Sequence, residues 1–210
     1  MFRIVLLMLA AWQILSAESH RVQSLHIRIL STMLADDDGF GEWGFSALVE
    51  ADGHKILFDT GAHPDTVLRN LRELKINLTA VPDVILSHNH IDHTGGLLTL
   101  RKEFPQSLQR AHAGQGILLQ RVGSNPMLKI KSAYDASGAK FIEYSQPVEL
   151  YTGIWLTGPV PRKYPERNWG GRRSQVRLPD GTTTEDNIPE DQSLVIDTDK
   201  GLVLISGCGH

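Results

Sequence analysis

Three histidines and one carboxylate lie within six residues of one another in the stretch 88–93. The groups that can bind a metal there are His88, His90, Asp92 and His93. Neutral imidazole nitrogen and carboxylate oxygen are the ligands of catalytic zinc sites, whereas structural zinc sites are mostly cysteine-rich and closed. A chance match to this spacing is rare even in a chain with nine histidines. The stretch therefore predicts a metal site.

The cluster falls between a predicted strand and a predicted helix. An apolar strand ends at residue 87, and a helix is predicted from about residue 94 to residue 103. Side chains alternate along an extended chain, so His88 and His90 are expected to point the same way. Asp92 and His93 are expected to turn toward the same side where the chain bends into the helix. All four groups then surround one small volume.

Two motifs resemble signatures of the metallo-β-lactamase superfamily. "HNHIDH" at residues 88–93 resembles its metal-binding motif, and "ILFDTG" at residues 56–61 resembles its second hallmark. In that hallmark an Asp, here Asp59, lies behind the metal ligands. A ligating His normally donates its other ring N–H to a carboxylate, which suits this role. The alternative is that Asp59 only caps the turn before the first helix.

The resemblance narrows to one subfamily, the 7,8-dihydropterin-6-yl-methyl-4-(β-D-ribofuranosyl)aminobenzene 5'-phosphate synthase-like proteins. It extends over about residues 40–210 and is carried by "EWGFSALVEADGHKILFDTG", "DVILSHNHIDHTGGL", "TGPVPR" and "EDQSLVIDTDKGLVLISGCGH". The resemblance implies an α/β fold, the αββα sandwich, with its second half incomplete in this chain. It is a weak guide to substrate, because one fold hosts many reactions.

The resemblance also implies ligands near the end of the sequence. The "GCSH" motif of the subfamily supplies a ligating His, and His210 falls on it. Asp191 is either a ligand, a group behind the ligands, or a plain turn acid. Cys208 either points toward the metal as a thiolate or is a small buried residue, the commoner place for a lone cysteine. Relatives continue with another strand, helices and a last His, so we expect a domain that lacks its C-terminal end.

The function implied by the resemblance is that of a metallo-hydrolase with two metal ions. Zinc is the expected metal, with iron or manganese as alternatives. Metal-activated water would attack a phosphoester or another ester-like anionic substrate, and Asp92 would orient that water. Arg162 is expected to bind the anionic substrate. Two other functions stay open: a metal-binding protein without catalytic activity, and a di-iron protein that handles oxygen.

Composition limits the domain count and the partners. A chain of 210 residues with 41% hydrophobic content can bury one core, so a single domain over residues 20–210 is expected. The formal net charge of −3 gives no reason to expect nucleic acid or an anionic membrane as a partner. Cys208 is the only cysteine, so His and Asp must do most of the metal binding. The expected partner is a small anionic molecule, and the sequence does not indicate an oligomeric state.

Residues 1–19 resemble a secretory signal peptide. Arg3 precedes an apolar run from Ile4 to Leu15, and small residues follow. The run is too short to span a bilayer comfortably. A buried first strand or helix is the alternative. The resemblance to a signal peptide predicts a periplasmic or secreted protein with no stable membrane span after cleavage.

Hydrophobic periodicity predicts strands interleaved with helices around one core. The expected strands are 25–30, 45–50, 54–61, 81–87, near 110, 140–144, 153–157, 193–198 and 202–206. Asp52 and Gly53 form a hairpin turn. Helices are expected after Pro64, over 94–103 and over 116–121. The strand over 202–206 is apolar throughout and is expected to be buried on both faces.

The remaining expectations concern a loop and three aromatic or imidazole side chains. Residues 159–190 contain five prolines and are predicted to be a long loop, either solvated or able to bind anions. His112 is expected to have a structural role. Trp43 and Phe45 are expected in the core, with a place in a pocket as the alternative.

Overall fold

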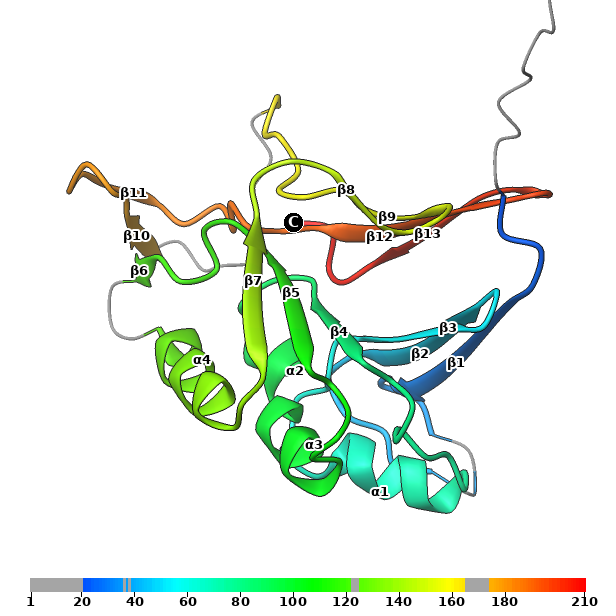
Figure 1. The fold of residues 1–210 in the computed structure, drawn as a ribbon. Coiled ribbons are helices and arrows are strands. Elements are labelled where there is room, and N and C mark those ends of the chain that lie inside the picture. The colour runs from blue at the N-terminus through cyan, green and yellow to red at the C-terminus, as the bar shows by residue number, and fades with distance from the viewer. Residues whose placement is uncertain (1–20, 36, 38, 122–124, 165–173) are drawn as a thin grey trace, which may run out of the picture.

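The computed structural model describes all residues except 1–20, 36, 38, 122–124 and 165–173. The predicted signal peptide lies outside the described residues. In the part of the chain that the structure describes, no helix has both the length and the apolar character needed to cross a membrane. The described residues form three layers: helices, a six-stranded sheet and a four-stranded sheet (Figure 1).

The six-stranded sheet is the central layer. Its strands are β1 (Leu25–Ser31), β2 (Ser46–Ala51), β3 (His54–Phe58), β4 (Asp83–Leu86), β5 (Arg110–Gly114) and β7 (Lys140–Tyr144), in the order β1-β2-β3-β4-β5-β7. Strands β1 to β3 pair antiparallel, and β3, β4, β5 and β7 pair parallel. The apolar β4 is buried along its whole length, as expected for a central parallel strand. The carboxyl ends of the parallel strands therefore meet at one edge of the sheet.

The predicted hairpin turn between β2 and β3 is confirmed. Asp52 and Gly53 both have positive φ, 45° and 84°. This is the conformation that a two-residue turn needs to match the twist of its flanking strands.

Helices cover one face of the six-stranded sheet (Figure 1). They are α1 (Thr66–Glu73), α2 (Ile91–Thr94), α3 (Leu97–Glu103) and α4 (Pro126–Ala136). The helix predicted over 94–103 is confirmed over 97–103, and Gly95 and Gly96 separate it from α2, which ends at Thr94. The helix predicted over 116–121 is wrong, because these residues form a turn that ends in the short strand β6 (Gln120–Arg121).

The four-stranded sheet packs against the other face of the six-stranded sheet (Figure 1). It consists of β8 (Val148–Tyr151), β9 (Ile154–Leu156), β12 (Ser193–Thr198) and β13 (Gly201–Ser206), in the order β13-β12-β9-β8. Phe58 and Ile85 from one sheet and Leu194 and Ile196 from the other belong to the same buried cluster. The α/β sandwich prediction is confirmed. One helix layer and these two sheets form the sandwich, and no helix among the described residues covers the outer face of the four-stranded sheet.

The prediction that the strand over 202–206 is buried on both faces is wrong for the structure described. Leu202 and Leu204 are 73% and 63% exposed, whereas Ile205 is buried. The reason is that alternate side chains face opposite sides of the sheet, and no helix among the described residues covers its outer face. One of its faces therefore presents apolar side chains to solvent.

The segment predicted to be a structureless loop, 159–190, contains two strands. They are β10 (Gln175–Arg177) and β11 (Thr183–Glu185), and β10 also pairs with β6 in a small three-stranded sheet. A central part of the segment lies outside the described residues. The pairing with β6 brings Val176 of this segment opposite Arg121.

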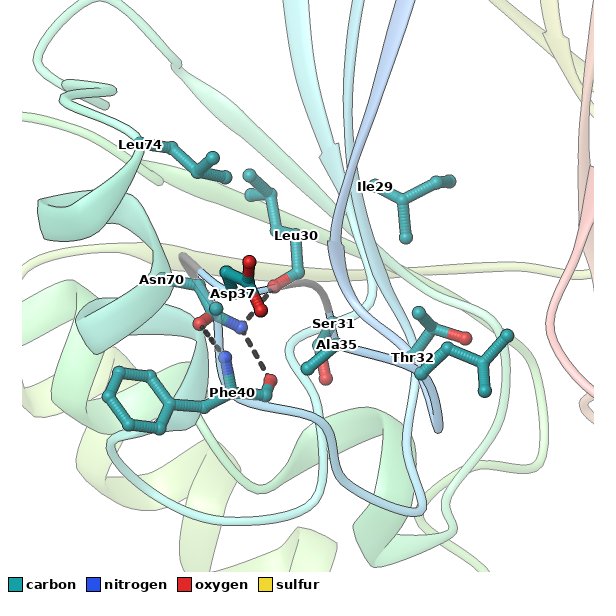
Figure 2. A pocket seen from close by; sticks show the side chains of 11 residues that line it. Ile29, Leu30, Ser31, Thr32, Ala35, Asp37, Phe40, Asn70 and Leu74 are labelled. Carbon is teal, nitrogen blue, oxygen red and sulfur yellow. Dashed lines mark hydrogen bonds between the residues drawn. The ribbon is translucent and has the colours of Figure 1, made fainter.

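A hollow of 470 Å³ lies between β1, α1 and the loop that follows β1 (Figure 2). Asn70 on α1 closes one side of it. The Nδ2 group of Asn70 donates to the carbonyl oxygens of Leu30 and Phe40 at 2.7 and 2.9 Å, and Oδ1 accepts the Phe40 N–H at 2.8 Å. The hollow includes none of the predicted site residues, so the chemistry predicted from the sequence lies elsewhere.

Candidate metal centre

The predicted histidine cluster forms where β4 ends and α2 begins. His88 is fully buried, and the centroids of the His90 and His93 rings lie 4.6 and 4.3 Å from the centroid of its ring. Asp92 faces the same space, with Oδ2 3.4 Å from Nε2 of His93. The structure therefore brings all four groups of the stretch together, as the alternation of side chains in the turn predicts.

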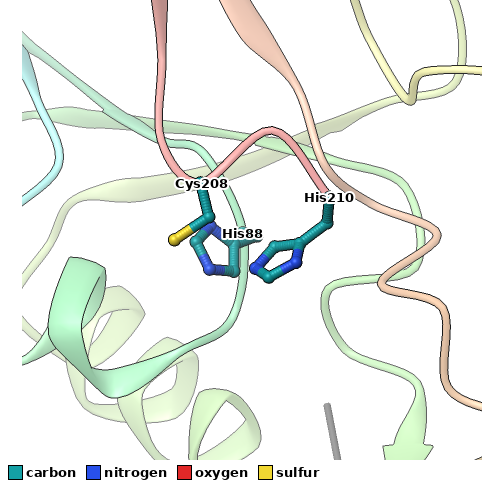
Figure 3. A group of neighbouring side chains, drawn as sticks. All are labelled: His88, Cys208 and His210. Atoms are coloured by element: carbon teal, nitrogen blue, oxygen red, sulfur yellow. The ribbon is translucent and has the colours of Figure 1, made fainter. Parts of the chain in front are cut away.

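The end of β13 brings two further groups to this cluster (Figure 3). The ring centroid of His210 lies 4.7 Å from that of His88 and 5.0 Å from that of His90. Sγ of Cys208 lies 3.2 Å from Nε2 of His93. Cys208 is exposed, so the alternative of a small buried residue is wrong.

The donor atoms of these residues fit a metal ion. Three groups have one donor atom per residue within 4.8 Å of each other: His88, Cys208 and His210; His88, His90 and Asp92; and Asp92, His93 and Cys208. Nε2 of His88 and Nε2 of His210 are buried and make no hydrogen bond. A buried polar atom without a partner costs free energy, and a metal ion would satisfy both nitrogens.

Asp59 lies behind the cluster, at the place the family resemblance implies. Its side chain is fully buried, and Oδ2 lies 2.6 Å from Nδ1 of His93. Ser87 donates to both of its oxygens, from N to Oδ1 and from Oγ to Oδ2, each at 2.7 Å. An Nδ1–H that donates to Asp59 directs Nε2 of His93, the nitrogen that a metal would bind, toward the other donors. The carboxylate of Asp59 therefore holds both ends of the turn that carries the candidate metal ligands, at Ser87 and at His93.

Ser87 is a residue of the site that the sequence analysis did not single out. Its hydroxyl lies 2.9 Å from Nδ1 of His88 and 2.7 Å from Oδ2 of Asp59, so it links His88 to the carboxylate that also contacts His93. A Cβ on Gly207 would lie 2.2 Å from the Ser87 hydroxyl. The glycine before Cys208 therefore allows the end of β13 to approach the turn. Gly207 is the feature of the sequence that could have pointed to this close approach.

The glycine pair after the histidine cluster also has a steric cause. A Cβ on Gly95 would lie 2.0 Å from the carbonyl oxygen of Ala62, and one on Gly96 would lie 2.4 Å from that of Thr60. Each distance is far below van der Waals contact. The two glycines allow the backbone after β3 to lie against the start of the helix, which places Asp59 beside His93.

Burial and the Asp59 charge divide the histidines into neutral and charged groups. Burial lowers the pKa of His88 well below its usual value and lowers the pKa of His210 to about 4. Burial also acts to lower the pKa of His93, but the charge and hydrogen bond of Asp59 outweigh it and raise this pKa to about 12. The rings of His88 and His210 are therefore in the neutral form that can bind a metal.

Asp191 is buried next to the cluster but belongs to none of the three groups of donor atoms found among the described residues. Burial raises the pKa of its carboxyl to about 7. Nη2 of Arg162 lies 4.0 Å from Oδ2 of Asp191 and donates to the carbonyl oxygen of Ile188 at 2.9 Å. The backbone N–H of Asp191 closes a turn on the carbonyl oxygen of Ile188 at 3.2 Å, and its role in the site stays a prediction. The guanidinium of Arg162 lies partly inside the protein instead of fully in solvent.

The other aromatic and imidazole candidates lie outside the cluster. His112 is buried, with Nε2 2.8 Å from Asp83 and Nδ1 3.0 Å from the hydroxyl of Tyr144, in agreement with the structural role predicted. Phe45 packs edge-on against Phe58 with 6.2 Å between ring centroids. The core position predicted for Trp43 is wrong, because its side chain is 75% exposed.

Comparison with known proteins agrees with this geometry. The model of the metallo-beta-lactamase superfamily matches residues 44–119, which include Asp59 and the histidine cluster. The uncharacterized protein MJ0448 of Methanocaldococcus jannaschii is 30% identical over 188 residues, which cover 88% of this chain and 69% of that protein. The chain belongs to the metallo-β-lactamase superfamily.

Two further relatives place the chain within this superfamily. The 7,8-dihydropterin-6-methyl-4-(beta-D-ribofuranosyl)-aminobenzene-5'-phosphate synthase of M. jannaschii is 28% identical over 81% of this chain. The crystal structure of Tm1679, described as a metal-dependent hydrolase of the beta-lactamase superfamily, is 28% identical over 87% of this chain, with a TM-score of 0.64. This metallo-β-lactamase-fold chain spans 62% of the length of the synthase and 65% of the Tm1679 chain.

Proposed function

We propose that the protein is a metal-dependent hydrolase that acts on a phosphoester or another ester-like anionic substrate. The observation that carries the proposal is the convergence of donor atoms from two sheets, in which Nε2 of His88 and Nε2 of His210 are buried without partners. Membership of the metallo-β-lactamase superfamily and the likeness to the hydrolase Tm1679 support it. Because one relative is a synthase, the class of reaction is part of the proposal.

The residues of the cluster would hold one or two zinc ions. The donors are His88, His90, Asp92, His93, Cys208 and His210. Zinc, when bound, supplies a Lewis acid that polarises the scissile bond and makes water nucleophilic near neutral pH. The side chain of Asp92 is 19% exposed, so its carboxylate can accept a hydrogen bond from a water molecule at the open side of the cluster and orient it.

Arg162 provides positive charge next to the cluster. Its charge helps to lower the pKa of His210, which places the guanidinium within electrostatic range of the donor atoms. Its Nη2 is fixed by the carbonyl oxygen of Ile188, and its Nε makes no hydrogen bond. A guanidinium binds phosphate or carboxylate oxygens through paired N–H groups, so Arg162 is suited to hold the anionic part of the substrate.

Removal of two donors tests the proposal. In the double variant His88→Ala/His90→Ala, we expect loss of stoichiometric zinc and of the hydrolysis of bis(4-nitrophenyl) phosphate. The matched control is His26→Ala, which removes an exposed histidine outside the cluster and leaves zinc content and turnover unchanged. Zinc is measured by elemental analysis of purified protein, and turnover is measured by release of 4-nitrophenolate.

Three results would contradict the proposal in different ways. Retention of zinc by the double variant would show that the metal site is elsewhere. Stoichiometric zinc without turnover of any phosphoester or ester would favour a metal-binding protein without catalytic activity. Iron in the purified protein, together with consumption of dioxygen, would favour the di-iron function.

A further inference from the structure

Glu190 lies against the metal-binding turn but offers no donor atom to the cluster. Its side chain is fully buried. Oε1 accepts a hydrogen bond from the backbone N–H of Asn89 at 3.2 Å. Asn89 is the residue between His88 and His90, so this hydrogen bond holds the part of the backbone that connects two of the donor side chains.

The second carboxylate oxygen of Glu190 is held by Arg121. Nη2 of Arg121 donates to Oε2 at 2.7 Å, and Nε donates to Oδ2 of Asp186 at 2.7 Å. Nη1 is directed at the carbonyl oxygens of Ile117 and Leu119, both at 3.3 Å. Because the guanidinium is planar and its donors form a rigid fork, Arg121 restricts Glu190 to one position.

The backbone around Glu190 is also fixed against the strands that carry the site. A Cβ on Gly114 would lie 2.0 Å from the carbonyl oxygen of Glu190, so β5 and this segment are in direct backbone contact. Two residues further on, Gln192 donates from its backbone N to the carbonyl oxygen of Ser87 at 3.0 Å and from Nε2 to that of Leu86 at 3.0 Å. The segment that begins with Glu190 therefore lies along the end of β4 with little freedom to move.

A contribution to stability alone does not account for this network. A buried ion pair is often no more stabilising than apolar side chains of the same volume, because the desolvation of the charges offsets their attraction. The network does provide a fixed acceptor for the N–H of Asn89, a buried residue whose N–H needs a partner. A metal site functions only when its donors are held within about 0.5 Å of the required geometry.

We propose that Glu190 is a positioning residue for the metal centre: through the N–H of Asn89 it sets the relative orientation of His88 and His90. The inference rests on the metal site proposed above and extends it to a residue that binds no metal. Arg121 acts one step further away, because it holds the carboxylate that holds the turn.

Binding of cobalt(II) to the full chain tests the inference, because visible absorption of cobalt reports the geometry of its ligands. Glu190→Asp keeps the charge that faces Arg121, but its side chain is shorter by one methylene and cannot reach both Arg121 and Asn89. Glu190→Gln keeps the length and loses the charge. In both variants we expect cobalt affinity to fall by about 10- to 100-fold and the absorption maximum to shift.

The matched control is Asp83→Asn. Asp83 is also a buried carboxylate paired with an arginine, and it lies at the start of β4, at the other end of this strand from the cluster. We expect this variant to melt at a lower temperature than the wild type and to keep the cobalt affinity and the cobalt spectrum of the wild type. Circular dichroism of the metal-free variants verifies that each is folded, and Glu190→Asp carries the test if Glu190→Gln does not fold.

The outcomes separate this inference from the proposed function. A wild-type spectrum and wild-type affinity in Glu190→Asp would overturn the inference. An equal change in Asp83→Asn would also overturn it, because it would show that the loss of any buried ion pair changes the cobalt site. A wild-type chain that takes up neither cobalt nor zinc would overturn the proposed function, and the inference with it.

Discussion

Asp59 shows at the scale of one residue how a carboxylate prepares a metal ligand. It accepts from Ser87 through both oxygens and lies 2.6 Å from Nδ1 of His93, and its own backbone has a positive φ of 55°. The contacts hold a proton on Nδ1 of His93 and leave Nε2 as the nitrogen that faces the other donors, from which a bound metal would displace the second proton. The role of Asp59 toward a bound metal stays a prediction, which the next variant tests.

In Asp59→Asn we expect zinc affinity and turnover to fall by about 10- to 100-fold with the fold intact, because one acceptor oxygen for Ser87 and His93 is lost. Zinc affinity is measured by competition with a chelating dye. Asp52→Asn is the control, since Asp52 also lies in a turn with positive φ but is far from the cluster in the sheet. Equal affinity in Asp59→Asn and the wild type would leave Asp59 as a turn residue only.

The residues of the site that could be predicted from the sequence are those that form local patterns. The histidine cluster and the Asp-Thr-Gly turn are each contained in a few neighbouring residues. Glu190 and Asn89, in contrast, are 101 residues apart, and their contact depends on how the second sheet packs on the first. No periodicity or spacing along the chain reports such a contact. Ser87 and Glu190 were therefore missed.

At the scale of the elements, a buried polar network joins the two sheets at the end of β4 away from the metal cluster. Asp83 begins β4 and is 1% exposed. It accepts from Arg110 at 2.6 and 2.8 Å, lies 2.8 Å from Nε2 of His112, and accepts from the hydroxyl of Tyr151 on β8. His54 stacks on the ring of Tyr151 at 3.9 Å between centroids. The network fixes how the four-stranded sheet lies on the six-stranded sheet.

This network predicts acid sensitivity of the fold. Burial acts to raise the pKa of Asp83, but the hydrogen bonds from His112, Arg110 and Tyr151 outweigh it and hold the pKa well below its usual value. A carboxyl with a lowered pKa in the folded state stabilises the fold above its unfolded-state pKa of about 3.9. That contribution is lost as the pH falls from about 4 toward the lower pKa of the folded state.

We expect Asp83→Asn to lower the free energy of unfolding at pH 7 by about 3 kcal/mol, the low end of the range for a broken buried pair, because Arg110 still reaches water. The measurement is urea unfolding between pH 7 and pH 3. The difference between wild type and variant should shrink below pH 4, where the Asp83 carboxyl of the unfolded wild type takes up a proton while that of the folded protein is still charged. A difference that does not change with pH would contradict the assignment of the effect to this charge.

The elements that could be predicted are those with clear apolar periodicity or turn chemistry, such as β3, β4 and the turn between β2 and β3. Helix α4 was missed because only Met127 and Tyr134 of its side chains are buried, which leaves a weak pattern. The signal that was present is its cap: the side chain of Asn125 accepts the N–H of Met127, and Pro126 is the first helical residue. Strand β6 is too short to have a pattern of its own.

At the scale of the whole molecule, the metal donors come from both sheets. The histidine cluster follows β4 of the six-stranded sheet, and Cys208 and His210 follow β13 of the four-stranded sheet. An ion bound by both sets would link the layers, in addition to the apolar core between them. The layered α/β fold could be predicted from the alternation of strands and helices, but this pairing of two strand ends depends on the packing of the layers.

Because zinc would bind the folded state and link its layers, the melting temperature should depend on free zinc. At a free concentration of 100 times the Kd, we expect about 2.7 kcal/mol of added stability, or a rise of about 5 to 10 °C for a chain of this size. The measurement is thermal unfolding in zinc buffers and in EDTA. His88→Ala/His90→Ala is the control, and its melting temperature should not respond to zinc. A wild-type melting temperature that is the same in EDTA and in zinc would contradict the link.

The distance along the chain between the two sets of donors has a consequence for the order of folding. Cys208 and His93 are in contact but are 115 residues apart. Contacts between distant residues form late, because the entropy of closing the loop must be overcome before the contact contributes. A refolding chain therefore presents the histidine cluster first, as an open and incomplete set of ligands, and gains Cys208 and His210 only when β13 docks. The incomplete set of ligands would accept many metal ions while the chain folds. The complete set would bind only ions that suit its geometry, once the two sheets have packed together.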